Sequence, residues 1–239
     1  MTSSAELRQN ELLAALPPTE WQRWLPQLEH VEMPLDQVLC ETGRTSSYVY
    51  FPTTSVVSLV SSMRNGAPAE VATVGNDGMV CISLFMGGQT TTTRAVVRIA
   101  GCGLRLPASF IREEFDRSAA VRTLMLRYTQ GLIAQMGQLA ACNRHRTIEQ
   151  QLCRLLLSSL DRVQGNEVEM TLELIANTLG VRREGVTLSA HKLQRAGMIH
   201  YARGHISVLD RPGLEQRSCE CYGEVRTEYR RLRRQEMVA

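Results

Sequence analysis

The chain has 239 residues and a formal net charge of +3, enough length for two small domains but too little charge to indicate a partner by itself. Hydrophobic residues make up 44% of the sequence, yet no apolar run approaches the roughly 18 residues that a membrane span needs. Residues 1–9 lack the apolar core of a signal peptide. We therefore expect a cytoplasmic protein with no membrane partner.

The first 107 residues change from a helical pattern to a strand pattern. Residues 8–29 have helically spaced leucines and tryptophans that Pro17 and Pro18 interrupt, and Thr19 is expected to cap the helix that follows. From about residue 31 to residue 107 the apolar spacing has a period of two. The predicted strands are residues 38–40, 48–51, 56–60, 70–74 and 94–99. Asn65-Gly66 predicts a hairpin turn, and the many short strands indicate a β-sandwich, roll or barrel.

Helical periodicity returns between residues 109 and 162. One apolar stripe has the heptad spacing of paired helices; it comprises Met125, Tyr128, Leu132, Gln135, Leu139 and Cys142. A second stripe lies beside it and comprises Leu126, Ile133, Met136 and Ala140. Two apolar faces favour a homodimer, with one face on the chain's own domain and one on a partner, and the alternative is a core helix packed on one side. We place the dimer seam at Met125, Tyr128, Leu132 and Leu139.

Residues 171–199 predict two short helices joined by a tight turn. Thr171 caps the first helix, and Gly180 ends it because glycine adopts a left-handed turn without steric cost. The second helix opens at Arg182 and closes at Gly197. Its first turn is rich in arginine and glutamate, which is where a DNA-recognition helix contacts base edges. The segment therefore predicts a helix-turn-helix.

Three further elements follow this motif. Residues 200–208 predict a two-stranded wing with a turn at Arg203-Gly204. Residues 209–213 predict a turn, and residues 215–235 a charged final helix. The arginines of that helix alternate with glutamates, so we expect them to form a solvated face.

The order of these elements resembles the Crp/Fnr family of bacterial transcription regulators. The segments that carry the resemblance are residues 37–43, 48–52, 75–95 and 182–193. The resemblance implies an α+β fold with an N-terminal antiparallel, jelly-roll-like β-roll of the cyclic-nucleotide-binding kind, a dimerisation helix and a C-terminal winged helix-turn-helix. We place the sensor roll at residues 1–112, the dimerisation helix and hinge at 113–146, and the DNA-binding domain with its final helix at 147–239. The implied partners are double-stranded DNA with a palindromic operator and a second copy of the chain, and contact with RNA polymerase remains open.

The segment that binds the cyclic phosphate in this family departs from the family pattern here. Family members that bind cyclic nucleotides carry Gly-Glu-x-Gly and, further on, Arg-x-Ala. In this chain Asn76 stands where the Glu is expected and Thr93 where the Arg is expected. Arg94 is one position off, which on a strand turns its side chain to the opposite face, although a bulge could bring it back. The candidate effector residues are Gly75, Asn76, Gly78, Thr93 and Arg94.

From this departure we expect a plain turn at residues 75–78 and control by something other than cyclic AMP. The alternatives are a regulator that responds to cyclic AMP or cyclic di-GMP, and the regulatory subunit of an enzyme. No catalytic motif occurs in the sequence, so we do not expect an enzyme.

The resemblance also assigns roles on the recognition helix. Arg183 and Glu184 would contact base edges, because arginine suits guanine and glutamate can accept a hydrogen bond from cytosine. Leu188 stands where well-known members have arginine, so the half-site should differ from theirs. Thr187 would add a contact, and Gly185 would hold the helix close to the groove. The expected phosphate contacts are Thr171, Arg182, His191 and Arg203.

The seven cysteines form no paired framework, and an odd number in a chain without a signal peptide predicts reduced thiols. Cys219 and Cys221 are the only closely spaced pair. A C-x-C pair can bind a soft metal in an extended segment, but side chains two positions apart in a helix diverge. Two ligands are also too few for a structural zinc site. We therefore expect a structural role for this pair, no metal site and no cofactor.

Overall fold

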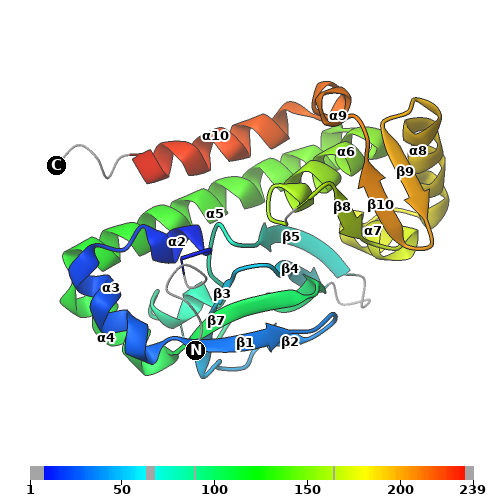
Figure 1. The fold of residues 1–239 in the computed structure, drawn as a ribbon. Helices are drawn as coiled ribbons and strands as arrows, with labels where there is room; N and C mark the ends of the chain where they lie inside the picture. Colours follow the sequence, from blue (N-terminus) through cyan, green and yellow to red (C-terminus); the bar gives the residue numbers. More distant parts are fainter. Residues whose placement is uncertain (1–7, 63–67, 89, 164, 235–239) are drawn as a thin grey trace.

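The computed structural model describes residues 8–62, 68–88, 90–163 and 165–234. It has an α+β fold, with two antiparallel sheets in the N-terminal half, a long helix running past them, and a helical C-terminal half that includes a small third sheet (Figure 1). Within the described ranges, none of the helices combines the length and apolar character needed to cross a membrane.

The N-terminal sheets enclose one hydrophobic core. The first sheet contains, in spatial order, β1 (Glu29–Met33), β7 (Gly101–Pro107) and β3 (Tyr48–Pro52). The second contains β2 (Val38–Cys40), β6 (Arg94–Ile99), β4 (Val56–Ser62) and β5 (Pro68–Val74). All five predicted strands are therefore confirmed. β4 and β5 pair antiparallel, and the turn predicted between them at Asn65-Gly66 lies outside the described residues.

β1 and β7 were not individually predicted. β7 lies between β1 and β3 in its sheet, and its glycines weaken the strand pattern in the sequence. Glycine is favoured at position 103, since a Cβ atom would lie 2.9 Å from the backbone oxygen of Phe51 as well as 2.3 Å from the end of the Met33 side chain. The strand thus carries glycine because its neighbours approach too closely for a side chain.

The N-terminal helical segment is divided into α2 (Glu11–Ala14), α3 (Pro18–Trp24) and the 3-10 helix η1 (Leu25–Gln27). The expectation that Thr19 caps α3 is wrong, because the helix already begins at Pro18 and Pro17 occupies the cap. Proline suits a first helical position, where its missing N–H is not needed. Asn10 caps α2 and also donates hydrogen bonds of 2.8 Å to the carbonyls of Pro52 and Gly78.

The helical stretch predicted between residues 109 and 162 consists of α4 (Ala108–Arg117), α5 (Ala119–His145) and α6 (Ile148–Leu160). Local caps create both breaks. The Ser118 side chain accepts a hydrogen bond from the Val121 N–H, and Thr147 forms a reciprocal capping box with Gln150.

The predicted dimer seam is wrong as an intermolecular surface. Met125, Tyr128, Leu132 and Leu139 are all buried within the chain, none more than 6% exposed. The Tyr128 hydroxyl donates to the Met79 carbonyl at 2.8 Å, so this face of α5 packs on the N-terminal half of the same chain. The exposed apolar side chains of α5 include two from the second stripe, Leu126 (49% exposed) and Ile133 (60% exposed).

The C-terminal half has its own hydrophobic core. Its elements are α6, β8 (Glu167–Glu169), α7 (Leu172–Leu179), α8 (Arg183–Arg195), β9 (Ile199–Ala202), β10 (His205–Val208) and α9 (Arg211–Arg217). The strands pair antiparallel in the order β8-β10-β9. The predicted helix-turn-helix and two-stranded wing are therefore present, and β8 adds a third strand.

The end of the chain differs from the prediction. The predicted turn at residues 209–213 is largely the start of α9, where the Asp210 side chain accepts a hydrogen bond from the Gly213 N–H. α9 ends before Ser218, and α10 (Glu220–Arg234) begins after Cys219. α10 then runs back along α5 (Figure 1), so the single final helix predicted for residues 215–235 is two helices.

One buried ion pair and one hydrogen bond from a second buried pair join the two halves of the chain. Arg162, which follows α6, contacts Asp77 through Nη2–Oδ2 (2.7 Å) and Nε–Oδ1 (3.1 Å). Burial opposes the charge on Arg162, but Asp77 outweighs it and the pKa of Arg162 is raised. Arg98 Nη1 lies 2.5 Å from Glu70 Oε2, and Arg98 Nη2 contacts Ser159 Oγ of α6 at 3.4 Å. The N-terminal half therefore contacts α6 and the residue Arg162 that follows it through charged side chains removed from water.

Cys40 and Cys81 are joined by a disulfide, which corrects the expectation that every cysteine is a reduced thiol. The two residues are 41 positions apart, and they meet because β2 ends beside the segment that precedes the 3-10 helix η2 (Ile82–Leu84). Sequence spacing gave no sign of this contact. The remaining five cysteines are free thiols.

Candidate nucleic-acid interface

The local sequence explains why α7 and α8 form as they do. Thr171 Oγ1 accepts a hydrogen bond from the Leu174 N–H at 3.1 Å and caps α7. Gly180 ends α7 with φ of 65°, as predicted. Arg182 is the N-cap of α8, without a side-chain capping bond, so the helix proper begins at Arg183. The buried stripe of Val186, Ala190 and Leu193 holds α8 on the domain core.

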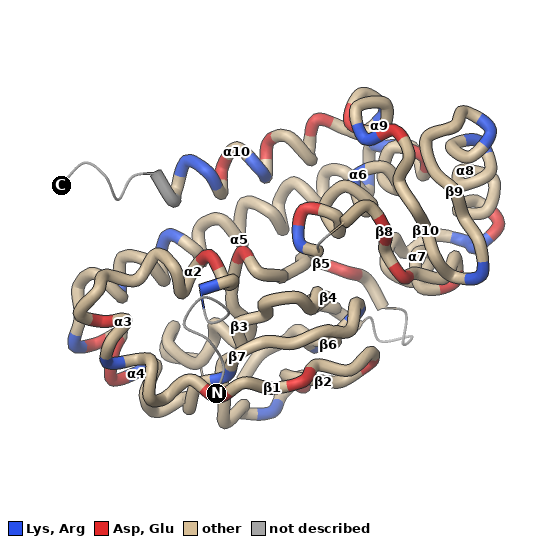
Figure 2. Tube along the Cα trace, in the orientation of Figure 1, with Lys and Arg blue, Asp and Glu red and all other residues tan. Residues whose placement is uncertain are grey.

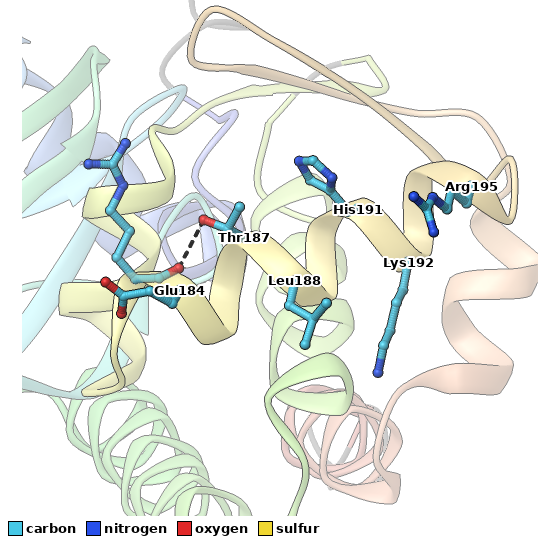
Figure 3. Close-up of a pocket in the computed structure, with 7 residues that line it drawn as sticks. Glu184, Thr187, Leu188, His191, Lys192 and Arg195 are labelled. Atoms are coloured by element: carbon cyan, nitrogen blue, oxygen red, sulfur yellow. Dashed lines mark hydrogen bonds between the residues drawn. The ribbon is translucent and has the colours of Figure 1, made fainter.

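The opposite face of α8 is open. Its side chains form a shallow surface lined by Arg183, Glu184, Thr187, Leu188, His191, Lys192 and Arg195 (Figure 3). Leu188 is 61% exposed, and the Thr187 hydroxyl donates to the Arg183 carbonyl at 3.0 Å. The structure thus brings all four predicted base-reading residues, Arg183, Glu184, Thr187 and Leu188, onto one face.

Arg183 has a neighbour that sequence reasoning missed. Its Nε lies 3.8 Å from Glu173 Oε2 in the first turn of α7, and both side chains are more than 60% exposed. An exposed ion pair of this length contributes little stability. The Arg183 guanidinium therefore lies near α7 and remains in solvent.

The predicted phosphate-contacting residues, Thr171, Arg182, His191 and Arg203, are all exposed. Thr171 lies beside the wing, since the neighbouring Met170 N–H donates to the Gly204 carbonyl at 2.8 Å. Arg203 and Gly204 both have positive φ, 50° and 87°, which produces the tight turn between β9 and β10. His191 lies instead on the face of α8. The structure therefore brings the start of α7 and the wing turn together.

Two basic residues on this surface were not predicted to contact DNA. Lys192 and Arg195 extend the exposed face of α8 beyond Leu188 and His191 (Figure 3), and their helical spacing could have revealed them. The one acidic residue of α8, Glu184, lies in its first turn beside Arg183, whereas Lys192 and Arg195 lie in its last turn (Figure 2). The surface therefore has local positive charge at its C-terminal end without a uniformly basic face.

Gly185 packs against the domain core. A Cβ atom at this position would lie 2.6 Å from Ile148 Cδ1 of α6. The glycine therefore allows α8 to pack closely on α6, and its expected role at the groove stays a prediction.

The predicted effector residues are separated by the fold. Residues 75–78 form a turn, as expected, but Gly75 packs against Arg162 and Gly78 against Tyr128. The Asn76 carbonyl accepts a hydrogen bond from the Glu11 N–H. Arg94 points to solvent and pairs with Glu41 at 3.3 Å, so no bulge returns it to a pocket. The effector site itself stays a prediction, and these contacts show that Gly75, Gly78 and Arg94 already have partners within the chain.

A cavity does exist between the roll and α5. Its volume is about 440 Å³, and of the predicted effector residues it contains Thr93. Leu132 and Met136 of α5 form one wall, and the Cys40–Cys81 disulfide and the threonines at positions 90–93 contribute to the rest. None of the lining residues within the described part of the chain is charged. The cavity therefore suits an apolar or neutral group better than a phosphate.

The exposed face of α8 lies within a segment that matches a known domain family. Residues 150–217 match the Crp-like helix-turn-helix domain family. Among curated proteins, none has a sequence that matches the chain significantly.

Solved structures share the fold of most of the chain. A putative transcriptional regulator of the Crp/Fnr family from Eubacterium rectale has a TM-score of 0.68 at 17% identity, covering 88% of this chain and 98% of its own. FixK2 from Bradyrhizobium japonicum has a TM-score of 0.66 at 15% identity, covering 80% and 98%. The c-di-GMP-responsive global regulator CLP from Xanthomonas campestris has a TM-score of 0.62 at 15% identity, covering 80% and 99%. The chain contains a Crp-like helix-turn-helix domain and has the fold of the Crp/Fnr transcription regulators.

Proposed function

We propose that the protein is a sequence-specific DNA-binding transcription regulator that acts as a homodimer and is controlled by something other than cyclic AMP. The observation that carries the proposal is the exposed face of α8 within a matched helix-turn-helix domain. In this motif the second helix enters the major groove and its first turns contact base edges.

The side chains on α8 suggest how a half-site is recognised. Arg183 can donate two hydrogen bonds to a guanine, and Glu184 can accept one from a cytosine. Leu188, which has no hydrogen-bonding group, can contact only an apolar group such as a thymine methyl. Thr171, Arg182, His191 and Arg203 would bind phosphates and fix the register of the helix on DNA.

A second copy of the chain fits the exposed stripe of α5. Leu126, Ile133 and Ala140 recur at intervals of seven residues and are exposed, which is the spacing of a two-helix seam. Gly137 lies on the same face with no atom near its Cβ position, so a partner helix can approach closely. Parallel pairing of two α5 helices would present two α8 helices to a palindromic site.

The uncharged cavity supports the expectation about the effector. A cyclic phosphate removed from water needs a cationic or hydrogen-bonding partner, and the cavity lining supplies threonines but no cation. The same argument applies to cyclic di-GMP, the ligand of the Xanthomonas regulator. A neutral ligand, or none, agrees better with this lining.

Binding to fragmented genomic DNA tests the function. The purified protein should retain a small set of fragments that share a palindrome, and an Arg183→Ala/Glu184→Ala variant should lose that enrichment while keeping its melting temperature. Retention of random fragments by both proteins would overturn sequence-specific recognition.

A further inference from the structure

Three cysteines from separate parts of the sequence meet in the C-terminal half. Cys142 lies in the last turn of α5, Cys219 in the break between α9 and α10, and Cys221 in the first turn of α10. Their sulfur atoms all lie within 4.8 Å of one another, and the three side chains are buried. The Sγ atoms of Cys142 and Cys219 are 3.2 Å apart.

The break before α10 makes this convergence possible. Cys219 precedes the helix and Cys221 lies inside it, so the divergence expected for two residues on one helix does not apply. Cys142, which comes 77 positions before Cys219, supplies the third sulfur that the C-x-C pair lacks. The cluster therefore offers three sulfur ligands, and not only the two of the C-x-C pair.

The distances suit a metal held by sulfur. Thiolates bind zinc at about 2.3 Å, and a tetrahedral arrangement then separates the sulfurs by about 3.8 Å. The observed spacing brackets that value, so small side-chain adjustments suffice. Within the described residues the cluster contains no carboxylate or imidazole, and an all-sulfur donor set selects soft ions over magnesium or calcium.

Arg154 of α6 places a positive charge near the three cysteines. Its Nε is buried without a hydrogen-bond partner in the part of the chain that the structure describes, and its charge acts on Cys142 and Cys219. Three thiolates around a divalent ion carry a net charge of −1, which an arginine neutralises. A small cavity of about 50 Å³, lined in part by Arg154 and Cys221, has room for a water molecule or small anion.

We propose that Cys142, Cys219 and Cys221 bind a soft d10 metal ion of the Zn²⁺ type, with the ion's fourth position directed to the cavity beside Arg154. A site with three protein ligands and one open position exchanges its metal more readily than a closed four-ligand site. Binding would fasten the end of α5 to the α9–α10 junction. The proposal does not depend on DNA recognition by α8.

Metal titration of the reduced, metal-free protein under anaerobic conditions tests the site. Co²⁺ serves as the optical probe, because thiolate-to-cobalt charge transfer absorbs in the near ultraviolet, and Zn²⁺ should displace it at one ion per chain. Cys142→Ser and Cys221→Ser should each weaken Zn²⁺ binding by more than about a hundredfold, since even outer-shell substitutions cost 10–100-fold. Arg154→Met should fall in that smaller range. Mg²⁺ should give no competition.

Cys102→Ser is the matched control, since Cys102 is a free, half-buried thiol outside the cluster and its variant should bind Zn²⁺ as the unaltered protein does. Bound Zn²⁺ should also raise the melting temperature in a concentration-dependent way and protect the three clustered thiols, but not Cys102, from alkylation. Should Cys142→Ser fail to fold, Cys221→Ser and the alkylation pattern still decide the question. Absence of stoichiometric binding, or equal binding by the ligand variants, would overturn the proposal.

Discussion

The first turn of α8 and the turn at residues 75–78 are both short polar segments for which the sequence predicts ligand contacts, but their charged side chains are paired differently in the structure. On α8, Arg183 reaches no closer than 3.8 Å to its acidic neighbour and remains in solvent. At the other turn, Asp77 is engaged by Arg162 through two contacts and both side chains are largely buried. A charged segment can recognise a ligand only where the chain has not already paired it, so the first segment is an open surface and the second is a joint between the two halves.

The largest expected effect comes from breaking the other buried ion pair, between Arg98 and Glu70. Arg98→Met would leave the Glu70 carboxylate buried, with hydrogen bonds from Ser58 and Thr73 but no countercharge. Loss of one partner of a buried pair costs about 3–5 kcal/mol of unfolding free energy, measurable by urea denaturation. Arg94→Met removes an exposed pair with Glu41 and should cost no more than about 1 kcal/mol. Equal losses in the two variants would show that burial does not distinguish the pairs.

The exposed stripe of α5 gives the next effect. Ile133→Asp should weaken dimerisation by about 1.5–3 kcal/mol for each substituted side chain, because the buried apolar contact is lost and a charge is introduced. Sedimentation equilibrium measures the change. Leu188→Asp, which also alters an exposed apolar residue, should leave the dimer intact. A dimer that tolerates Ile133→Asp would place the seam elsewhere.

Substitution of Arg183 on the exposed face of α8 should have a smaller effect, on the affinity for DNA. Arg183→Ala should reduce specific DNA binding by about 1–3 kcal/mol and relax the preference at one base pair. Selection from a randomised site, together with binding to the unaltered consensus, measures both. Arg230→Ala on α10 is the control, since its exposed arginine lies far along the chain from the reading face. An unchanged base preference in Arg183→Ala would remove this residue as a reader.

Cyclic AMP should have no effect at all. The cavity beside α5 has no cation among its described lining residues, so millimolar cyclic AMP should change neither the melting temperature nor the DNA affinity. A rise of several degrees in melting temperature would contradict this expectation, because stabilisation by a ligand requires binding to the folded state.

Sequence reasoning succeeded where the signal was local. The caps, turns and apolar stripes of α7 and α8 depend on residues a few positions apart, and the structure confirms Thr171 as a cap and Gly180 as a left-handed terminus. It failed where contacts join distant segments. The apolar stripe at Tyr128 and Leu132 indicated a buried face correctly, but a stripe does not specify whether its partner belongs to the same chain. Likewise, the approach of Cys142 to Cys219 depends on the path of α10, which no local pattern encodes.

That path has a consequence for how the protein is made. α10 begins in the C-terminal half, but its Tyr229 belongs to the same core cluster as the N-terminal sheets and α5. The N-terminal half therefore receives part of its interior from the last helix of the described chain, which has 15 residues. During synthesis this half can collapse but cannot complete its core until α10 has left the ribosome. Its final packing is thus a late event, which sets it apart from the usual sequence in which an N-terminal domain folds first.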